Sequence, residues 1–141
     1  MKIFPLEVKG YRREERKDGL PKKAGIYCVF TCNVTEEDKL STLKLIYIGE
    51  SDNIYSRHNE KKHEHYDDFC LYKRKNKADT LCYSYILIED EDDRKRCEAA
   101  MIYKMQPPIN LQNTIEFNYP PTHIKLSGKL IDLETDFVVG E

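Results

Sequence analysis

The sequence predicts an α+β fold: a small, three-stranded, mainly antiparallel sheet flanked by helices, with short additions at both ends of the chain. Three observations predict it. Short apolar runs rich in β-forming residues recur along the chain. Polar segments that open with helix-capping residues separate them. The resulting order of strand, strand, helix, strand, helix is typical of a sheet with helices packed on it. A length of 141 residues suits a single domain, 1–141.

Three apolar runs are the expected strands of this sheet. Ala24 to Phe30 is a short run of β-formers and predicts a buried strand. Residues 31–42 are polar and predict a long hairpin connection to the second strand, Leu43 to Ile48. Leu81 to Ile88 predicts the third strand, with apolar side chains on both faces.

The first helix is expected directly after the second strand. Ser51 or Asp52 can cap it, because a short side-chain oxygen accepts from the first free backbone N–H groups. The helix is predicted from Asn53 to about His65, and its few apolar residues indicate an exposed face. Phe69 to Asp79 is interpreted as a basic linker.

The second helix is expected between Asp90 and about Met105. Acidic residues at its start suit the positive end of the helix dipole. Pro107 ends it, since proline cannot continue a helix. Outside these elements we expect one strand near Ile3 to Val8 and a hairpin that pairs 124–126 with 130–133.

The charge distribution gives a mixed indication of partners. The net charge is −2, whereas nucleic-acid binders usually carry a basic excess. Basic residues nevertheless outnumber acids in 1–24 and 54–77, so a locally basic face could bind phosphates. Without a long apolar segment or a leader-like N-terminus, we expect no membrane association and a cytoplasmic location.

The cysteines and histidines do not form a recognisable metal-binding pattern. The five cysteines have no CxxC spacing and are interpreted as reduced, mostly buried thiols. His58, His63, His65 and Cys70 are close in sequence but lack the repeated spacing of structural zinc ligands. Solvated or substrate-facing histidines are therefore favoured over a zinc site.

Five ordered landmarks resemble the signature of GIY-YIG nucleases. They are Gly25-Ile26-Tyr27, Tyr47-Ile48-Gly49, Arg57 eight residues after Gly49, Glu98 in a later helix, and Asn110 behind the prolines that end that helix. Each tripeptide alone is uninformative, so the weight comes from the order and spacing. The resemblance covers about residues 20–112 and leaves 113–141 as a C-terminal extension.

The resemblance implies a metal-dependent endonuclease that hydrolyses phosphodiester bonds. Glu98 is then the metal ligand, because Mg²⁺ (or Mn²⁺) prefers hard oxygen ligands and a single carboxylate can suffice when substrate phosphate completes the shell. Glu98 stands on the edge of an apolar stripe with Met101, Ile102 and Met105, where an unpaired carboxylate is unfavourable. Without the resemblance, an edge glutamate paired with a lysine is the simpler interpretation.

The same resemblance gives roles to an arginine and two tyrosines. Arg57 would hold the scissile phosphate, which its planar, permanently charged fork fits better than lysine does. Tyr27 would act as general base or orient water, with Tyr47 hydrogen-bonding beside it. On the residues alone, Arg57 could equally be a solvated helix residue and the tyrosines core aromatics.

The chain departs from the family pattern four residues after the arginine. The usual histidine or tyrosine is replaced there by Lys61, which lies on the same helix face as Arg57 and could hold a phosphate or assist a tyrosine. His58 or His63 could take the acid–base role instead. Arg57, Lys61, His63 and Asn110 are the expected substrate-binding residues, although Asn110 could also only hold the loop after the helix.

Nucleic acid, DNA rather than RNA, is the expected partner. Neither end of the chain contains a zinc finger, a helix-turn-helix or a basic tail, so a partner chain or a homo-oligomer would supply specificity. The alternative is a GIY-YIG-like module that binds nucleic acid or protein without cutting. A convergence of Tyr27, Tyr47, Arg57 and Glu98 on one cleft would favour the enzyme.

Overall fold

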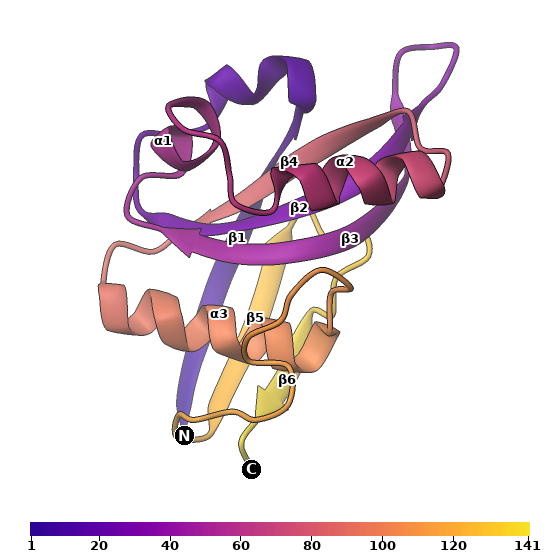
Figure 1. The fold of residues 1–141 in the computed structure, drawn as a ribbon. Coiled ribbons are helices and arrows are strands. Elements are labelled where there is room, and N and C mark those ends of the chain that lie inside the picture. The colour runs from indigo at the N-terminus through magenta and orange to yellow at the C-terminus, as the bar shows by residue number, and fades with distance from the viewer.

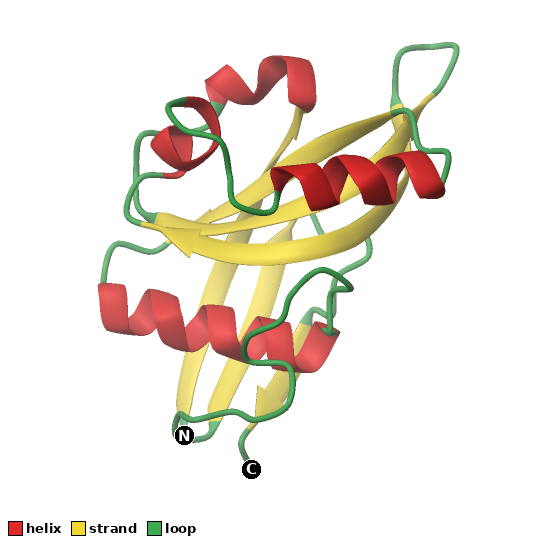
Figure 2. Cartoon of the chain, in the orientation of Figure 1, coloured by secondary structure: helices red, strands yellow, loops and turns green.

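The computed structural model describes residues 1–141. It contains six strands, three α-helices and one 3₁₀ helix (Figures 1 and 2). In chain order these are β1 (Lys2–Arg13), η1 (Glu14–Gly19), β2 (Gly25–Val34), β3 (Leu40–Ser51), α1 (Ile54–Asn59), α2 (Tyr66–Lys75), β4 (Thr80–Leu87), α3 (Glu91–Met105), β5 (Thr122–Gly128) and β6 (Asp136–Val139).

The strands form one mixed, curled sheet in the order β3-β2-β4-β1-β5-β6. Neighbouring strands are antiparallel except β1 and β5, which are parallel. In Figure 1, β2, β3 and β4 cross the upper half of the molecule, and β1, β5 and β6 run steeply down behind α3. No helix is long and apolar enough to cross a membrane.

The prediction of a small three-stranded sheet is therefore wrong. The three expected strands exist as β2, β3 and β4, but the sheet continues through β1, β5 and β6. The cause is long-range pairing: Lys2 to Val8 lie in register beside Thr122 to Gly128, and Lys9 to Arg13 pair with β4. The alternating buried residues Phe4 and Val8 make this half of β1 a core strand.

Two helix boundaries also differ from the prediction. The helix expected over 53–65 ends at Asn59, and α2 begins at Tyr66 and takes up residues 69–75 of the expected basic linker. Asn53, rather than Ser51 or Asp52, is the N-cap: its Oδ1 accepts from the Ser56 N–H at 3.0 Å. In α2, buried Phe69 anchors an otherwise polar helix, which its few apolar residues did not reveal.

The C-terminal hairpin pairs different residues from those expected. β5 pairs with β6, and 130–133 lie in the connection between them. Leu130 and Leu133 still pack against the core, so their apolar character reflects burial in a turn rather than a strand. The second predicted helix is confirmed as α3, which ends at Met105 with Gln106 in the left-handed conformation.

Strands β2 and β4 are buried on both faces of the sheet, which explains the continuous apolar run of β2. Ile26, Cys28 and Phe30 face α3, whereas Tyr27 and Val29 face α1, α2 and η1. Two cores therefore form, one on each side. The five cysteines are free thiols, four of them buried, as the sequence predicts.

Candidate active site around Tyr27 and Glu98

Tyr27 lies across the backbone of the neighbouring strand. It stands opposite Gly49 in the β2–β3 register. A Cβ on Gly49 would lie 2.3 Å from the Tyr27 hydroxyl oxygen, closer than any side chain permits. Glycine at this position therefore lets the Tyr27 ring cross β3, which gives a physical reason for an aromatic on one strand opposite a glycine on the next.

A hydrogen bond joins Tyr27 to His63. The Tyr27 hydroxyl oxygen lies 2.7 Å from Nε2 of His63. The backbone N–H of His65 donates to Nδ1 of the same ring at 3.0 Å, so Nδ1 carries no proton in the neutral imidazole. Nε2 consequently bears the hydrogen and donates it to Tyr27. Burial, followed by the charge of Arg57, lowers the pKa of His63 to about 3, so the ring is neutral near pH 7.

His58 lies against the same Tyr27 ring, beside His63. Its ring meets Tyr27 edge-on at a centroid distance of 4.4 Å and stacks 5.5 Å from His63. Nε2 of His58 is buried without a hydrogen-bond partner. Burial, followed by the charge of Arg57, lowers its pKa to about 3. The expectation of solvated histidines is wrong for both, since His58 is 6% and His63 3% exposed.

Tyr47 stands beside Tyr27 at the edge of the sheet. A bulge at Ile46 shifts the β2–β3 register and turns Tyr47 toward α1 and α2. The Tyr27 and Tyr47 rings are stacked with centroids 6.3 Å apart. Burial, followed by the charges of Glu98 and Glu64, raises the pKa of the Tyr47 hydroxyl to about 12.

Glu98 projects from α3 into a cavity of about 160 Å³ that Tyr47 also lines. Glu64, His65 and Asn110 complete much of the lining. Glu98 makes no salt bridge and no hydrogen bond in the structure. Burial, followed by the charge of Glu50, raises its pKa to about 7. An unpaired, mostly buried carboxylate of this kind is unfavourable unless a cation or a proton reaches it.

Arg57 reaches the site from α1. Its guanidinium donates to Oε1 of Glu64 at 3.2 Å, and Glu64 is 68% exposed. The pKa of the Tyr27 hydroxyl is raised by burial and by the nearby Tyr47, and the charge of Arg57 acts against this increase. Glu98 raises the same pKa further. Tyr47 and Glu98 line one cavity and Arg57 lines its polar neighbour, whereas Tyr27 lines neither and contacts the site through Tyr47 and His63.

Asn110 is bonded to the edge strand rather than pointed at open solvent. Its Oδ1 accepts from the Ile48 N–H at 2.9 Å, and its Nδ2 donates to the Ile48 carbonyl at 2.8 Å. The backbone N–H of Ile109 donates to the Ile46 carbonyl. The segment thus covers the free edge of β3. Both polar groups of the Asn110 amide are occupied, so its observed contacts are those of the loop-holding alternative.

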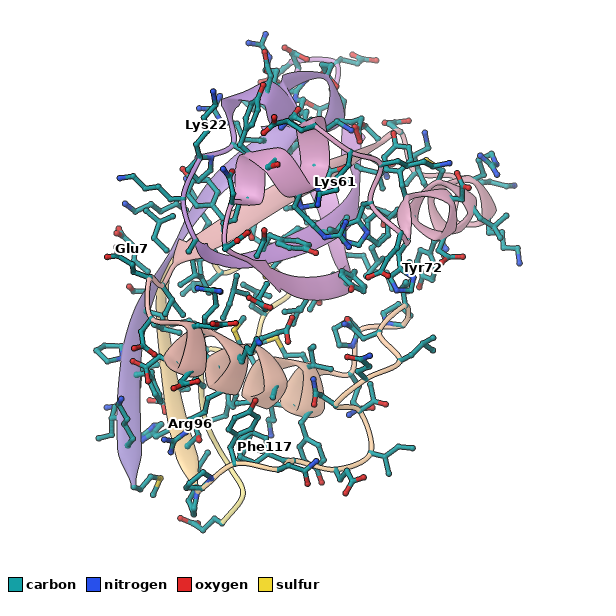
Figure 3. All side chains as sticks on the ribbon, turned by 60° about the vertical axis from the view of Figure 1, so that its left-hand side comes forward. Glu7, Lys22, Lys61, Tyr72, Arg96 and Phe117 are labelled. Carbon is teal, nitrogen blue, oxygen red and sulfur yellow. The ribbon has the colours of Figure 1, made fainter.

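Lys61 lies beyond the end of α1, exposed to solvent. It lines a second, wholly polar cavity together with Arg57. In Figure 3, Lys61 lies in the upper part of the molecule, and Arg96 and Phe117 lie below, along α3. His63, and not Lys61, is the residue that contacts Tyr27. Because α1 ends at Asn59, the chain turns back after the helix and brings His63, instead of Lys61, to Tyr27.

A single divalent cation fits the donor chemistry of the site. No group of three or more His, Cys, Asp and Glu side chains is positioned to hold a metal. Glu98 offers an unpaired and largely buried carboxylate beside a cavity, and a hard cation with water and phosphate ligands can be held by one protein carboxylate. Comparison of the chain with protein-family models, curated proteins and solved structures finds no match.

Proposed function

We propose that this protein is a GIY-YIG-type endonuclease that hydrolyses phosphodiester bonds in nucleic acid, with DNA as the expected substrate. One observation carries the proposal: Tyr47 and the unpaired carboxylate of Glu98 line one cavity at the edge of the sheet, with Tyr27 stacked on Tyr47 and Arg57 lining the neighbouring cavity. Such a set of perturbed groups beside a cavity is typical of catalytic sites.

Glu98 would hold the metal ion. When bound, Mg²⁺ (or Mn²⁺) polarises a phosphoryl oxygen and organises water. The chain supplies a carboxylate whose negative charge burial and Glu50 disfavour. A cation would relieve that unfavourable charge, so its binding is coupled to deprotonation of Glu98.

Tyr27 and His63 would handle the proton. The neutral His63 donates its Nε2 hydrogen to the Tyr27 oxygen, so the Tyr27 hydroxyl hydrogen is directed elsewhere. The Tyr27 hydroxyl can thus orient a water. To act as a general base it must first lose its own hydrogen to solvent; the positive charge of Arg57 favours the resulting phenolate, which would then accept the proton of the attacking water. His63 stabilises the phenolate through the same hydrogen bond.

Arg57 would bind the phosphate that is cleaved. Its partner Glu64 is exposed, and an exposed ion pair contributes little stability. The guanidinium can therefore exchange Glu64 for phosphate oxygens, which it binds bidentately. Lys61 adds a second positive charge on the same side of the cavity.

A non-catalytic binding module is the second candidate function. The burial of Tyr27, which is 1% exposed, favours it, because burial holds the hydroxyl protonated. The net charge of −2 and the lysine at position 61 favour it as well. Both candidate functions go with a cytoplasmic location. In both, a partner chain or a second copy would supply specificity.

Incubation with nucleic acid separates the two candidates. Supercoiled plasmid and labelled single strands are incubated with the protein in Mg²⁺ or Mn²⁺, and again with EDTA. The enzyme predicts nicked or shortened products that are absent in EDTA. Binding of the same substrates without any product, in either metal, would contradict the enzyme and leave the module.

A further inference from the structure

A polar cavity of about 280 Å³ lies next to the candidate active site, between the α1 segment and α3. None of its lining residues is hydrophobic, in contrast to most small-molecule pockets. Its charged lining residues are four cations, Arg57, Lys61, Arg94 and Lys95, and three acids, Glu50, Asp52 and Glu91. A lining of this kind favours a charged, hydrated ligand over an apolar one.

The cations come from both sides of the cavity. Arg57 and Lys61 belong to α1 and the loop after it, whereas Arg94 and Lys95 lie in the first half of α3. Arg94 is 4% exposed: Nε lies 2.6 Å from Oε2 of Glu50, and NH1 donates to the carbonyls of the preceding loop. Arg94 therefore fixes α3 against β3 and is not free to bind a ligand.

Two lysines of the cavity, Lys61 and Lys95, can bind a ligand. Lys61 makes no salt bridge, and the pair of Lys95 with Glu91, at 2.9 Å, is 49% and 65% exposed. An exposed i,i+4 pair contributes little stability, so an anion can displace Glu91. Lysine binds phosphate as a compact point charge.

The polar cavity lies next to the active-site cavity, and residues of β3 and α3 line both. Glu50 and Lys95 line the polar cavity, while Tyr47 and Glu98 line the neighbouring one. Lys95 and Glu98 are three residues apart on α3 and so lie on the same face.

We propose that this cavity binds the backbone phosphate next to the one that is cleaved, through Lys61 and Lys95 on its opposite sides. The proposal rests on the proposed function and deepens it, since it makes a polynucleotide, with at least two phosphates, the preferred substrate. It also assigns Lys61 to phosphate binding instead of proton transfer.

The test is a binding measurement that needs no cleavage. Anisotropy of a fluorescein-labelled DNA single strand is measured in EDTA over a series of salt concentrations. Lys61→Ala and Lys95→Ala are each expected to weaken binding about three- to tenfold at low salt. Each should also reduce the slope of log K against log salt by roughly 0.7, the value for one lost contact to a single strand.

Lys129→Ala is the matched control, because Lys129 is an exposed lysine in the loop between β5 and β6. If Lys61→Ala and Lys95→Ala change the affinity and slope no more than this control, the proposed subsite is wrong. Inorganic phosphate is added as a competitor; displacement of DNA at equal phosphate concentration would indicate a free-anion site and overturn the proposal.

The outcomes distinguish the subsite from the catalytic activity. A wild-type protein that cuts DNA, with both lysine variants bound as tightly as the control, contradicts the subsite alone. A wild-type protein that shows the lysine-dependent binding but cuts no nucleic acid with Mg²⁺ or Mn²⁺ supports the phosphate site and contradicts the proposed function.

Discussion

The hydroxyl oxygen of Tyr27 accepts a hydrogen bond from Nε2 of His63 at 2.7 Å, across 36 positions of the sequence. Two opposing effects meet at this oxygen. Burial raises the pKa of the hydroxyl, whereas a donated hydrogen bond and the charge of Arg57 favour the phenolate. The hydrogen bond from His63 therefore fixes the Tyr27 hydroxyl so that it can orient water. The same bond would stabilise the Tyr27 phenolate, which is the form that can take up a proton.

Replacing His63 tests this pair. His63→Ala removes the donor, and we expect nuclease activity to fall about 10²-fold or more, the usual contribution of a positioned acid–base group. His63→Gln, whose amide can donate, should recover part of the loss. His123→Ala is the control, since His123 pairs with Asp136 on β5 and β6. Equal activity of His63→Ala and His123→Ala, measured as initial cleavage rates, would contradict the role.

Gly49→Ala tests the contact between the strands. The new Cβ would lie 2.3 Å from the Tyr27 oxygen, within a packed core, so we expect a loss of about 1–3 kcal/mol in the free energy of unfolding. Gly19→Ala is the matched comparison, because its Cβ meets only the mobile end of Arg12. Urea denaturation of both variants measures the difference. A Gly49→Ala protein as stable as Gly19→Ala would show that Tyr27 does not cross β3.

Asn110→Ala distinguishes the two roles open to this residue. It removes two hydrogen bonds to the Ile48 backbone at the sheet edge, and we expect a loss of about 1–3 kcal/mol in unfolding free energy. Hydrogen exchange at the Ile48 amide should accelerate as well. Unchanged stability together with a raised KM would instead assign Asn110 to substrate binding.

The central strands and α3 could be predicted from local pattern. β2 and β4 are apolar on both faces because two cores enclose them, and α3 has acidic residues at its start and Pro107 beyond its end. The parallel pairing of Lys2–Val8 with Thr122–Gly128 could not be predicted, since no short-range signal connects segments so far apart.

The candidate site was predictable only in part, for the same reason. Tyr27, Tyr47 and Glu98 follow from ordered landmarks, and the structure brings them to one edge of the sheet. The contact of His63 with Tyr27 depends on the end of α1 at Asn59. The thin apolar content of 53–65 was the available signal, because a helix without an apolar stripe gains little stability from packing.

The pH dependence of stability tests the environment of Glu98. Its pKa is raised from 4.5 to about 7, so the folded protein binds an extra proton between these values. The unfolding free energy therefore falls as the pH rises through this window, and the loss is complete above pH 7. Glu98→Gln removes the loss.

We expect Glu98→Gln to be about 2 kcal/mol more stable than the wild type at pH 8 and nearly equal to it at pH 4, in urea denaturation. Added Mg²⁺ should stabilise the wild type and not the variant. Glu7→Gln, on the exposed face of β1, serves as the control. A Glu98→Gln protein that is no more stable than Glu7→Gln at pH 8 would disprove the buried, unpaired state of this carboxylate.

Single-turnover cleavage of a labelled DNA in Mg²⁺, by the wild type and by Glu98→Gln, tests the central claim most directly. Because both proteins should fold, and the variant should be the more stable at pH 8, a loss of activity reports on metal binding. We predict cleavage by the wild type and a rate at least about 10²-fold lower in Glu98→Gln. Cleavage by Glu98→Gln at the wild-type rate would contradict the assignment of Glu98 as the metal ligand.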